Sequence, residues 1–498
     1  MTQLTEPPFG PAATHARLDG AAAADPDAGT GDLLRATAER AIAFRESLPR
    51  RRVGAERGLR ADDLRVALGE AIPDHGEPAG DVIDRLIAAM EPGLVAIPGP
   101  RYFGFVMGGS VPASLAADWL TSAWDQNVAM FLSTPGAAVV EHVTADWLVD
   151  LFGLPDGTSV GFTTGATTAT FTALAAARHA VLRGAGWDVE ANGLIGAPEV
   201  DVVLGEDAHT SVFVALRMLG LGRDRPRRVA VDDEGRIRPV ALRATLQSLG
   251  GRDRPTIVVA QAGEVNTGAF DDLDAVTRIV REERDAAWIH VDGAFGLWAI
   301  AVPGMRASLA GMADADSWTT DAHKWLNVPY DCGLVFVRDA AAHRAAMGMA
   351  AAYLPPAPGE ERDPFDYVPE MSRRGRAIPV WAALRSLGRD GIAELVERCC
   401  TIARRMADAL AAEPGIEIVN EVTLNQVLVR FGDDDDQTKA VIAAVQDDGT
   451  CWLGGTTWHG RGAMRISVSN WSTREADADR SVEAILRAYR ATATQPGA

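Results

Sequence analysis

The stretch Ser317-Trp318-Thr319-Thr320-Asp321-Ala322-His323-Lys324-Trp325 combines a short strand-like run with a lysine placed just after it. Lysine is rare in this chain of 498 residues, because only Lys324 and Lys439 among its 48 basic residues are lysine. An ε-amine can lose its proton and attack a carbonyl group, whereas a guanidinium stays charged. Lys324 is therefore a candidate for Schiff-base chemistry, which among cofactors points to pyridoxal 5′-phosphate. Lys439 lies in an acidic, helix-like stretch and is interpreted as a surface residue.

The region around this lysine alternates short apolar runs with helical stretches. Near-continuous apolar strands between helices indicate an α/β fold with a mostly parallel sheet covered on both faces. A second region, after residue 376, carries strand patterns at 426–431 and 464–468 and helical patterns at 392–412, 438–446 and 476–489. It predicts a smaller α+β domain. The seven strands expected in the large sheet are residues 160–163, 202–204, 228–231, 256–261, 288–291, 317–320 and 333–337.

The pattern divides the chain into four segments. Residues 1–30 are rich in Ala, Pro and Asp and lack the basic start and apolar core of a signal peptide, so we expect a disordered tail. Residues 31–112 are expected to be an N-terminal helical segment, and 376–498 the small C-terminal domain. Between them, residues 113–375 are the expected large domain, which ends in a long loop rich in Pro, Glu and Asp at 351–376, expected to be mobile.

Composition excludes some partners. The net charge of −20 disfavours nucleic acids and anionic membranes, and no apolar run is long enough to span a bilayer. The four cysteines show no metal-ligand spacing, so the sequence predicts no metal site. Free thiols in a reducing cytoplasm are the simplest interpretation.

Residues able to hold a cofactor follow several of the expected strands. The turn Gly165-Ala166-Thr167 opens a helix, and small residues with free N–H groups there could bind a phosphate; a plain helix start is the alternative. His209 follows another strand, where an imidazole could stack on an aromatic ring or serve only as a structural residue. Ligands bind at the carboxyl ends of strands in such sheets, so these residues are expected to converge.

Asp292 ends a buried apolar strand and needs a partner there. A protonated pyridine nitrogen would be such a partner, through a charge-assisted hydrogen bond worth roughly 1.5–3 kcal/mol. Ala294 is small enough to lie under the face of the ring. The alternative is an aspartate that caps a loop.

Taken together, these stretches resemble the group II pyridoxal-phosphate decarboxylases, the family of aromatic-amino-acid, histidine and glutamate decarboxylases. The resemblance extends from about Leu33 to Tyr489. The stretches that carry it are 101–105 (Arg-Tyr-Phe-Gly-Phe), 146–148 (Asp-Trp-Leu), 208–211 (Ala-His-Thr-Ser), 290–294 (His-Val-Asp-Gly-Ala), 323–325 (His-Lys-Trp), 330–332 (Tyr-Asp-Cys) and 372–374 (Ser-Arg-Arg).

The resemblance implies fold type I, the aspartate-aminotransferase type, and a homodimer in which residues 31–112 serve dimerisation. Lys324 would form the Schiff base, Asp292 would pair with the pyridine nitrogen, and His209 would stack on the ring. The remaining implied contacts are Gly165, Ala166, Thr167, Ala294 and His323 for the cofactor, and Phe103, Phe105, Glu264 and Arg465 for the substrate; core packing explains the two phenylalanines equally well.

Four positions depart from the family pattern. The phosphate turn continues Thr167-Thr168-Ala169 where the family has Ser-Glu-Ala. Glu264 stands where aromatic-amino-acid decarboxylases carry a Thr; it could bind a polar substrate or only hydrogen-bond nearby backbone. Gly108 replaces a Thr that contacts the substrate carboxylate in some relatives. The loop tyrosine that protonates the reaction intermediate falls at Pro364, with Tyr353 and Tyr367 nearby but off register, and Tyr367 is the candidate for that role.

The expected activity is removal of the α-carboxylate of an L-amino acid, aromatic or similar, to give an amine and CO2. The displaced tyrosine keeps a second outcome open, in which decarboxylation is joined to oxidative deamination and yields an aldehyde. Another C–C lyase reaction, or a non-catalytic binding module that retains only the fold, are the further alternatives.

Overall fold

The computed structural model describes residues 29–349 and 361–493. Residues 1–28 of the expected tail, and residues 351–360 of the expected mobile loop with Tyr353 among them, therefore lie outside the described residues. The described residues divide into two compact units, the first within Met1–Ser47 and Gly58–Gly93 and the second within Leu48–Arg57 and Leu94–Ala498. Within the described residues, no helix has the length and apolar character needed to cross a membrane.

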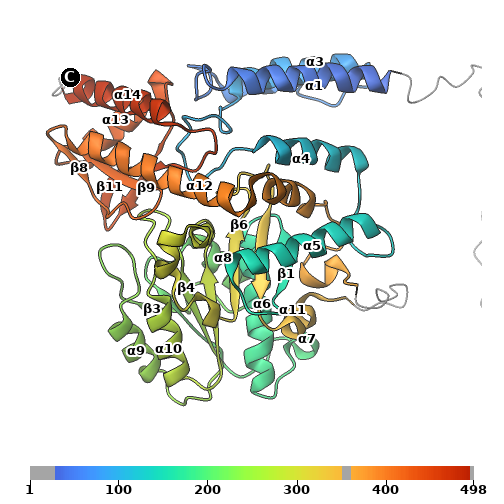
Figure 1. Cartoon of the computed structure of the whole chain (residues 1–498), viewed down its shortest axis with the longest axis vertical. Coiled ribbons are helices and arrows are strands. Elements are labelled where there is room, and N and C mark those ends of the chain that lie inside the picture. Colours follow the sequence, from blue (N-terminus) through green and yellow to red (C-terminus); the bar gives the residue numbers. More distant parts are fainter. Residues whose placement is uncertain (1–28, 350–360, 494–498) are drawn as a thin grey trace, which may run out of the picture. The chain divides into compact units, whose positions relative to one another are not determined.

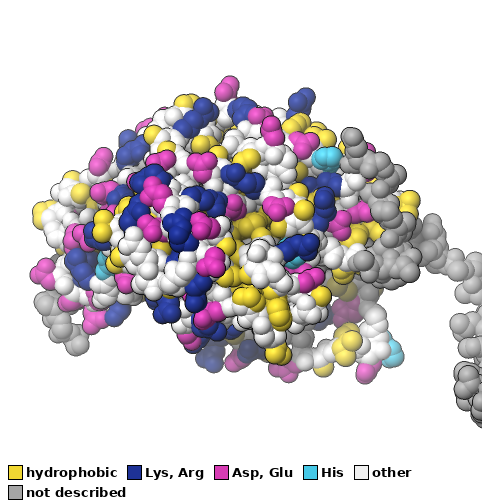
Figure 2. Space-filling view, turned by 90° about the horizontal axis from the view of Figure 1, so that it is seen from below, with side chains coloured by type: hydrophobic (Ala, Val, Ile, Leu, Met, Phe, Trp, Pro, Cys, Tyr) yellow, Lys and Arg dark blue, Asp and Glu magenta, His cyan; other side chains and the backbone are white. Residues whose placement is uncertain are grey.

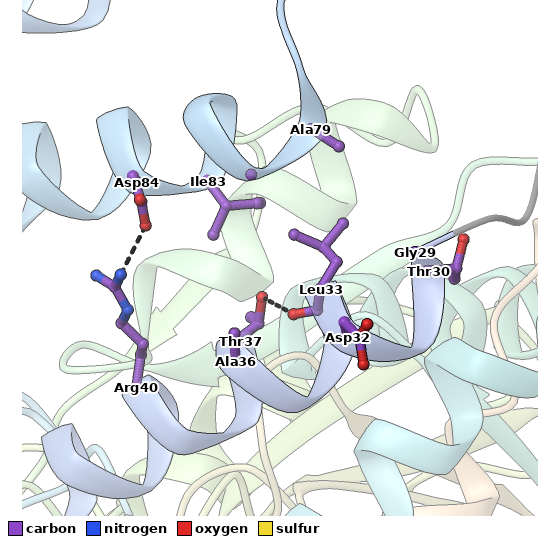
Figure 3. A pocket seen from close by; sticks show the side chains of 11 residues that line it. Gly29, Thr30, Asp32, Leu33, Ala36, Thr37, Arg40, Ala79, Ile83 and Asp84 are labelled. Atoms are coloured by element: carbon purple, nitrogen blue, oxygen red, sulfur yellow. Dashed lines mark hydrogen bonds and ion pairs between the residues drawn. The ribbon is translucent and has the colours of Figure 1, made fainter.

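The first unit consists of α1 (Thr30–Ser47), α2 (Ala61–Leu68), α3 (Ala79–Met90) and the short η1 (Glu91–Gly93). A groove of about 530 Å³ lies between α1 and α3, lined by Leu33, Ala36 and Ile83 and closed at one end by the Arg40–Asp84 ion pair of 2.8 Å (Figure 3). Neither α1 nor α2 buries a residue. These helices therefore have little core of their own.

The second unit is built around a seven-stranded sheet in the order β1-β7-β6-β5-β4-β2-β3 (Figure 1). Strand β7 is antiparallel to both of its neighbours, and the other pairs are parallel. Fold class and strand number are as the sequence predicts. The strands are β1 (Ser159–Thr163), β2 (Asp201–Gly205), β3 (Arg227–Val229), β4 (Thr256–Gln261), β5 (Ala287–Asp292), β6 (Ser317–Asp321) and β7 (Gly333–Val337).

Both faces of this sheet are covered, which explains why its strands read as continuous apolar runs. Along β4, Val258 and Ala260 belong to one hydrophobic cluster, whereas Ile257 and Val259 belong to another. The second cluster is supplied by α6 (Ala166–Gly184), α8 (Thr210–Met218) and α11 (Ala340–Met347). The first is supplied mainly by α5 (Pro135–Phe152), α9 (Pro239–Ser248), α10 (Leu273–Glu283) and α12 (Ala377–Ala411). The remaining short elements are α4 (Pro112–Trp124), α7 (Val189–Asn192), η2 (Gly296–Ala301), η3 (Pro303–Leu309), η4 (Met312–Asp314) and η5 (Pro364–Tyr367).

The C-terminal part carries a four-stranded antiparallel sheet in the order β10-β11-β9-β8. The expected strands are present as β9 (Gln426–Phe431) and β11 (Arg461–Ser467), next to α13 (Asp435–Asp448) and α14 (Glu475–Ala493). Two strands were not predicted, β8 (Ile416–Ile418) and β10 (Gly454–Trp458). Helix α12 begins fifteen residues before its expected start at Ile392, and its kink lies at Gly388.

Charges of opposite sign are interspersed on one face of the molecule. On the face that Figure 2 shows, Lys and Arg side chains lie among Asp and Glu side chains. Many arginines are paired locally, as in Arg405 with Asp479 and Arg490 with Glu413.

Candidate active site

Side chains able to do chemistry gather at the carboxyl ends of neighbouring strands. Asp292 is the last residue of β5, and Asp321 is the last residue of the adjacent β6. His209 follows β2, as the N-cap of α8. Because parallel strands in one sheet end at the same edge, these residues meet where α/β folds bind ligands.

Lys324 lies in the turn after β6 and contacts a buried carboxylate. Its Nζ is 3.0 Å from Oδ2 of Asp321. The other oxygen of Asp321 accepts a hydrogen bond of 2.6 Å from the N–H of Ala166, and lies 3.6 Å from Nε2 of His323. The structure thus brings three predicted cofactor residues together around one acid.

The sequence analysis did not single out Asp321. Its signal was nevertheless present, since an acid at the end of a buried strand needs a partner, as argued for Asp292. Asp321 occupies the same position on β6 that Asp292 occupies on β5.

Asp292 is buried close to His209, and the charge of each acts on the other. Burial raises the pKa of Asp292, whereas the nearby positive charges of His209 and Lys324 oppose that rise. Burial lowers the pKa of His209, and the charge of Asp292 opposes that change. The Asp292 carboxylate accepts a 3.2 Å hydrogen bond from Ala294 N–H. A buried carboxylate with so few donors is suited to receive a cationic ring nitrogen.

His209 and His323 are both held by hydrogen bonds. Nδ1 of His209 lies 2.8 Å from the Ser211 hydroxyl and accepts from the Ser211 amide at 3.3 Å. Nδ1 of His323 accepts from the Cys332 amide at 3.0 Å, so its Nε2 carries the proton that faces Asp321. The His323 ring stacks on Tyr330 at 4.4 Å, and burial lowers the pKa of His323.

The turn before α6 is shaped to receive an anion. Gly165 is the N-cap and supplies no side-chain cap, so the helix start depends on other acceptors. A Cβ on Gly333 of β7 would lie 2.4 Å from the carbonyl carbon of Gly165, which shows how closely the turn packs on the sheet. Thr167, the second residue of α6, has an exposed side chain. This cradle, together with Asp292 and Lys324, fits pyridoxal 5′-phosphate.

The candidate substrate residues are placed differently from one another. Phe103 is buried in the main hydrophobic cluster, as expected for core packing. Phe105 is 54% exposed and stacks on Trp452 at 5.8 Å. Arg465 on β11 donates from Nη1 to Val265 O and to Asn266 Oδ1, and its charge acts on His209.

Glu264 points into its own loop. Its carboxylate accepts hydrogen bonds from the amides of Asn266 at 2.6 Å and Thr267 at 2.8 Å, and from the Asn266 side chain at 3.0 Å. Burial raises its pKa. In this structure Glu264 therefore stabilises the turn between β4 and α10, the backbone role that the sequence left open.

Tyr367 is buried at the end of η5. Its hydroxyl accepts from Nη1 of Arg344 at 3.4 Å, the Arg362 guanidinium lies 4.0 Å from its ring centre, and its ring meets that of His343 edge-on. None of these partners belongs to the predicted site, and Pro364 is buried on the same short helix.

Gly108 lies directly against the lysine turn. A Cβ at this position would lie 1.9 Å from the main-chain oxygen of Lys324. The neighbouring Gly109 donates its N–H to Oδ1 of Asn327 at 2.6 Å. No side chain can therefore be added at 108 while the Lys324 turn keeps its present position.

This fold and site define a fold type I enzyme that uses pyridoxal 5′-phosphate. Residues 62–431 match the family described as the pyridoxal-dependent decarboxylase conserved domain, and the chain belongs to this family. It is 28% identical over 375 residues to the aromatic-L-amino-acid decarboxylase of Bacillus atrophaeus, covering 74% of this chain and 75% of that protein. It is 25% identical over 433 residues to phenylacetaldehyde synthase of Arabidopsis thaliana, covering 83% and 86%.

The crystal structure of Oryza sativa TDC with PLP and tryptamine shares the fold. It superposes with a TM-score of 0.86 over 96% of this chain and 99% of that chain, at 22% sequence identity. The protein is thus an amino acid decarboxylase, a carboxy-lyase dependent on pyridoxal 5′-phosphate, as the sequence predicts.

Proposed function

We propose that the protein removes the α-carboxylate of an aromatic or similar L-amino acid and releases the amine. The observation that carries the proposal is the contact of Lys324 with Asp321 at the end of β6, together with the buried Asp292 at the end of β5 and His209 after β2. A relative named aromatic-L-amino-acid decarboxylase, matched over three quarters of its length, supports the substrate class.

Each of the predicted cofactor residues has its own role in this proposal. Lys324 would hold the cofactor covalently, and the Ala166 amide and Thr167 would bind its phosphate. When bound, pyridoxal 5′-phosphate supplies an acceptor for the electron pair left by the departing CO2. Asp292 would keep the proton on the ring nitrogen, because a buried carboxylate is stabilised by a cationic partner. His209 would support the ring.

The two lysines allow a sharp test of the covalent step. Borohydride reduction of the cofactor-loaded chain followed by peptide mapping should place the label at Lys324. Lys324→Ala should abolish both label and activity, whereas Lys439→Ala should keep both, since Lys439 is exposed and pairs with Asp436 on the surface. Label retained in Lys324→Ala would exclude the proposed role.

The substrate class needs a separate experiment. Products formed from a panel of natural amino acids, with cofactor added and in air, should be identified by mass spectrometry. An amine from an aromatic amino acid is the expected result. An amine formed only from acidic or basic amino acids would contradict the proposed class.

An aldehyde product is the second candidate. The position of the usual loop tyrosine is Pro364, and Tyr367 makes its contacts with Arg344, Arg362 and His343. The relative named phenylacetaldehyde synthase supports this alternative. Oxygen consumption in step with aldehyde and ammonia release would establish it, and turnover without oxygen uptake would exclude it.

A homodimer is also part of the proposal. On α4, Trp119, Leu120 and Trp124 are 41%, 47% and 53% exposed, and in the first unit Leu34 and Leu86 are exposed as well. Large apolar side chains on the surface of helices are typical of an interface between subunits. Light scattering should give twice the chain mass of 52.8 kDa, and a monomer at micromolar concentration would contradict this proposal.

A further inference from the structure

Asp321 is the acid to which the predicted cofactor residues converge. It is 2% exposed, and each of its oxygens has a distinct partner. Oδ2 faces the Lys324 ammonium at 3.0 Å, while Oδ1 accepts the Ala166 N–H at 2.6 Å and lies 3.6 Å from His323 Nε2. No role follows for this carboxylate from the reaction described above.

The Ala166 amide is the first N–H of α6, a helix of 19 residues. The first amides of a helix have no acceptor within the helix and form its anion-binding end. A phosphate seated at this end would use the same N–H that Asp321 now accepts. A single N–H donor cannot form a full hydrogen bond to two anions at once. Two anions that both lie against this N–H also repel each other.

We propose that Asp321 sets the affinity and selectivity of the phosphate cradle by competing with the cofactor phosphate for the Ala166 N–H. When phosphate binds, the carboxylate gives up this hydrogen bond and keeps its approach to the proton on His323 Nε2. The inference rests on the proposed placement of the phosphate at the start of α6. Asp321 is thus a positioning residue, acting on the cofactor through the donor that both share.

Asp321→Asn separates charge from shape. The amide oxygen can still accept from Ala166, but as a neutral acceptor it competes less strongly for this N–H and carries no charge to repel a phosphate. A ligand with a phosphate should therefore bind the variant more tightly than it binds the original chain. A ligand of the same ring without a phosphate should not distinguish them.

The probes are pyridoxine 5′-phosphate and pyridoxine, measured by titration calorimetry on the full-length, cofactor-free chain. Neither has an aldehyde, so neither reacts with Lys324, and binding is read without activity. Asp321→Asn should tighten pyridoxine 5′-phosphate by about tenfold or more, the size expected for removing a like charge beside a buried anion. Pyridoxine should change by less than about twofold.

Asp316→Asn is the matched control. Asp316 directly precedes the same strand at its opposite end, where it accepts from the Ile289 amide at 2.7 Å and pairs with Arg281. It undergoes the same loss of charge away from the cradle, so the ratio of the two affinities should stay unchanged. A merely structural role of Asp321 would shift both ligands together.

The outcomes separate this inference from the phosphate placement on which it rests. If Asp321→Asn weakens the phosphate ligand or leaves the ratio unchanged while Thr167→Val still weakens that ligand selectively, the cradle is correct and the competition is refuted. If neither variant alters the ratio, the placement at α6 fails, and the inference fails with it. Selective tightening of pyridoxine 5′-phosphate in Asp321→Asn, with no change of the ratio in Asp316→Asn, supports the proposal.

Discussion

Asn327 joins three segments that are far apart in the sequence, and this makes it the most informative residue to change. Its side chain is fully buried, and its φ of 57° is in the left-handed region. Oδ1 accepts from the amides of Gly109 at 2.6 Å and Trp471 at 2.9 Å. Nδ2 donates to the carbonyl oxygens of Trp325 at 2.8 Å and Ser469 at 2.9 Å. Every donor and acceptor of the amide is thereby used.

Asn327→Asp keeps the shape and the two accepted bonds but replaces both donated bonds with an oxygen facing two carbonyl oxygens. Each buried carbonyl that loses its donor costs about 1–3 kcal/mol, so we expect a loss of about 2–6 kcal/mol in the free energy of unfolding. Asn192→Asp is the control. Asn192 is exposed and donates one bond to Asp188 O, so its change should stay within about 0.5 kcal/mol.

The assay is urea denaturation of the cofactor-loaded chain, with the midpoint and slope compared between variants. Because Asn327 is bonded to the carbonyl of Trp325, the residue after Lys324, release of cofactor on dilution should also be faster in Asn327→Asp. A loss below about 1 kcal/mol, with cofactor release unchanged, would refute the idea that this side chain positions the lysine turn.

Three further changes test other parts of the fold. Glu141→Gln leaves the buried guanidinium of Arg373, now 2.8 Å from Glu141, without its counter-charge, so urea denaturation should show a loss of about 3–5 kcal/mol; an unchanged midpoint contradicts this. Burial raises the pKa of Asp271 to about 6, above its unfolded value, so its contribution to stability is present at low pH and is lost as pH rises from about 4 to 6. The unfolding free energy of the original chain minus that of Asp271→Asn should therefore fall as the pH rises across that window, and a difference independent of pH would contradict the assignment. Gly108→Ala places a methyl group against the Lys324 oxygen and should weaken cofactor retention and cost about 1–3 kcal/mol, whereas a fully loaded, equally stable variant would disprove the close contact.

The large sheet was predictable because its strands are buried on both faces. Residues 256–261 and 333–337 were expected as strands and have those bounds as β4 and β7. A strand buried on both faces, such as β4 or β7, favours apolar residues on both sides, which leaves a signal that does not depend on neighbours in space. The short elements lacked it. The Gly-Gly-Thr-Thr sequence of β10 carries no apolar alternation, and this strand exists because it pairs with β11.

Helix α12 was underestimated for a related reason. The helical pattern was expected only from Ile392, and Pro379 and Gly388, which precede it, are unfavourable inside a helix in isolation. In the structure, Pro379 falls in the first turn, where its missing N–H costs nothing, and Gly388 takes a φ of 63° at the kink. Packing of Val380, Ala383 and Leu384 in the main cluster holds the first part of the helix in place.

The site was predictable where a residue type is tied to its chemistry, and less so where contacts decide. Lys324, Asp292 and His209 stood out because each ends or follows an expected strand, where α/β folds bind ligands. The roles of Asp321 and Glu264 depend on which oxygen faces which amide, and sequence spacing does not encode that. The substrate walls are the least predictable part, since Phe103 and Phe105 are two residues apart and one is buried while the other is exposed.

The role of Gly108 can be understood only together with the Lys324 turn that it contacts. Compared with relatives that carry a Thr there, Gly108 suggests only a lost contact to the substrate carboxylate. In the structure, the space for that side chain is taken by the main-chain oxygen of Lys324. Asn327 holds this arrangement by accepting the N–H of Gly109 while donating to Trp325 O. A Thr at 108 would therefore require a different path of the Lys324 turn, and the two positions must change together.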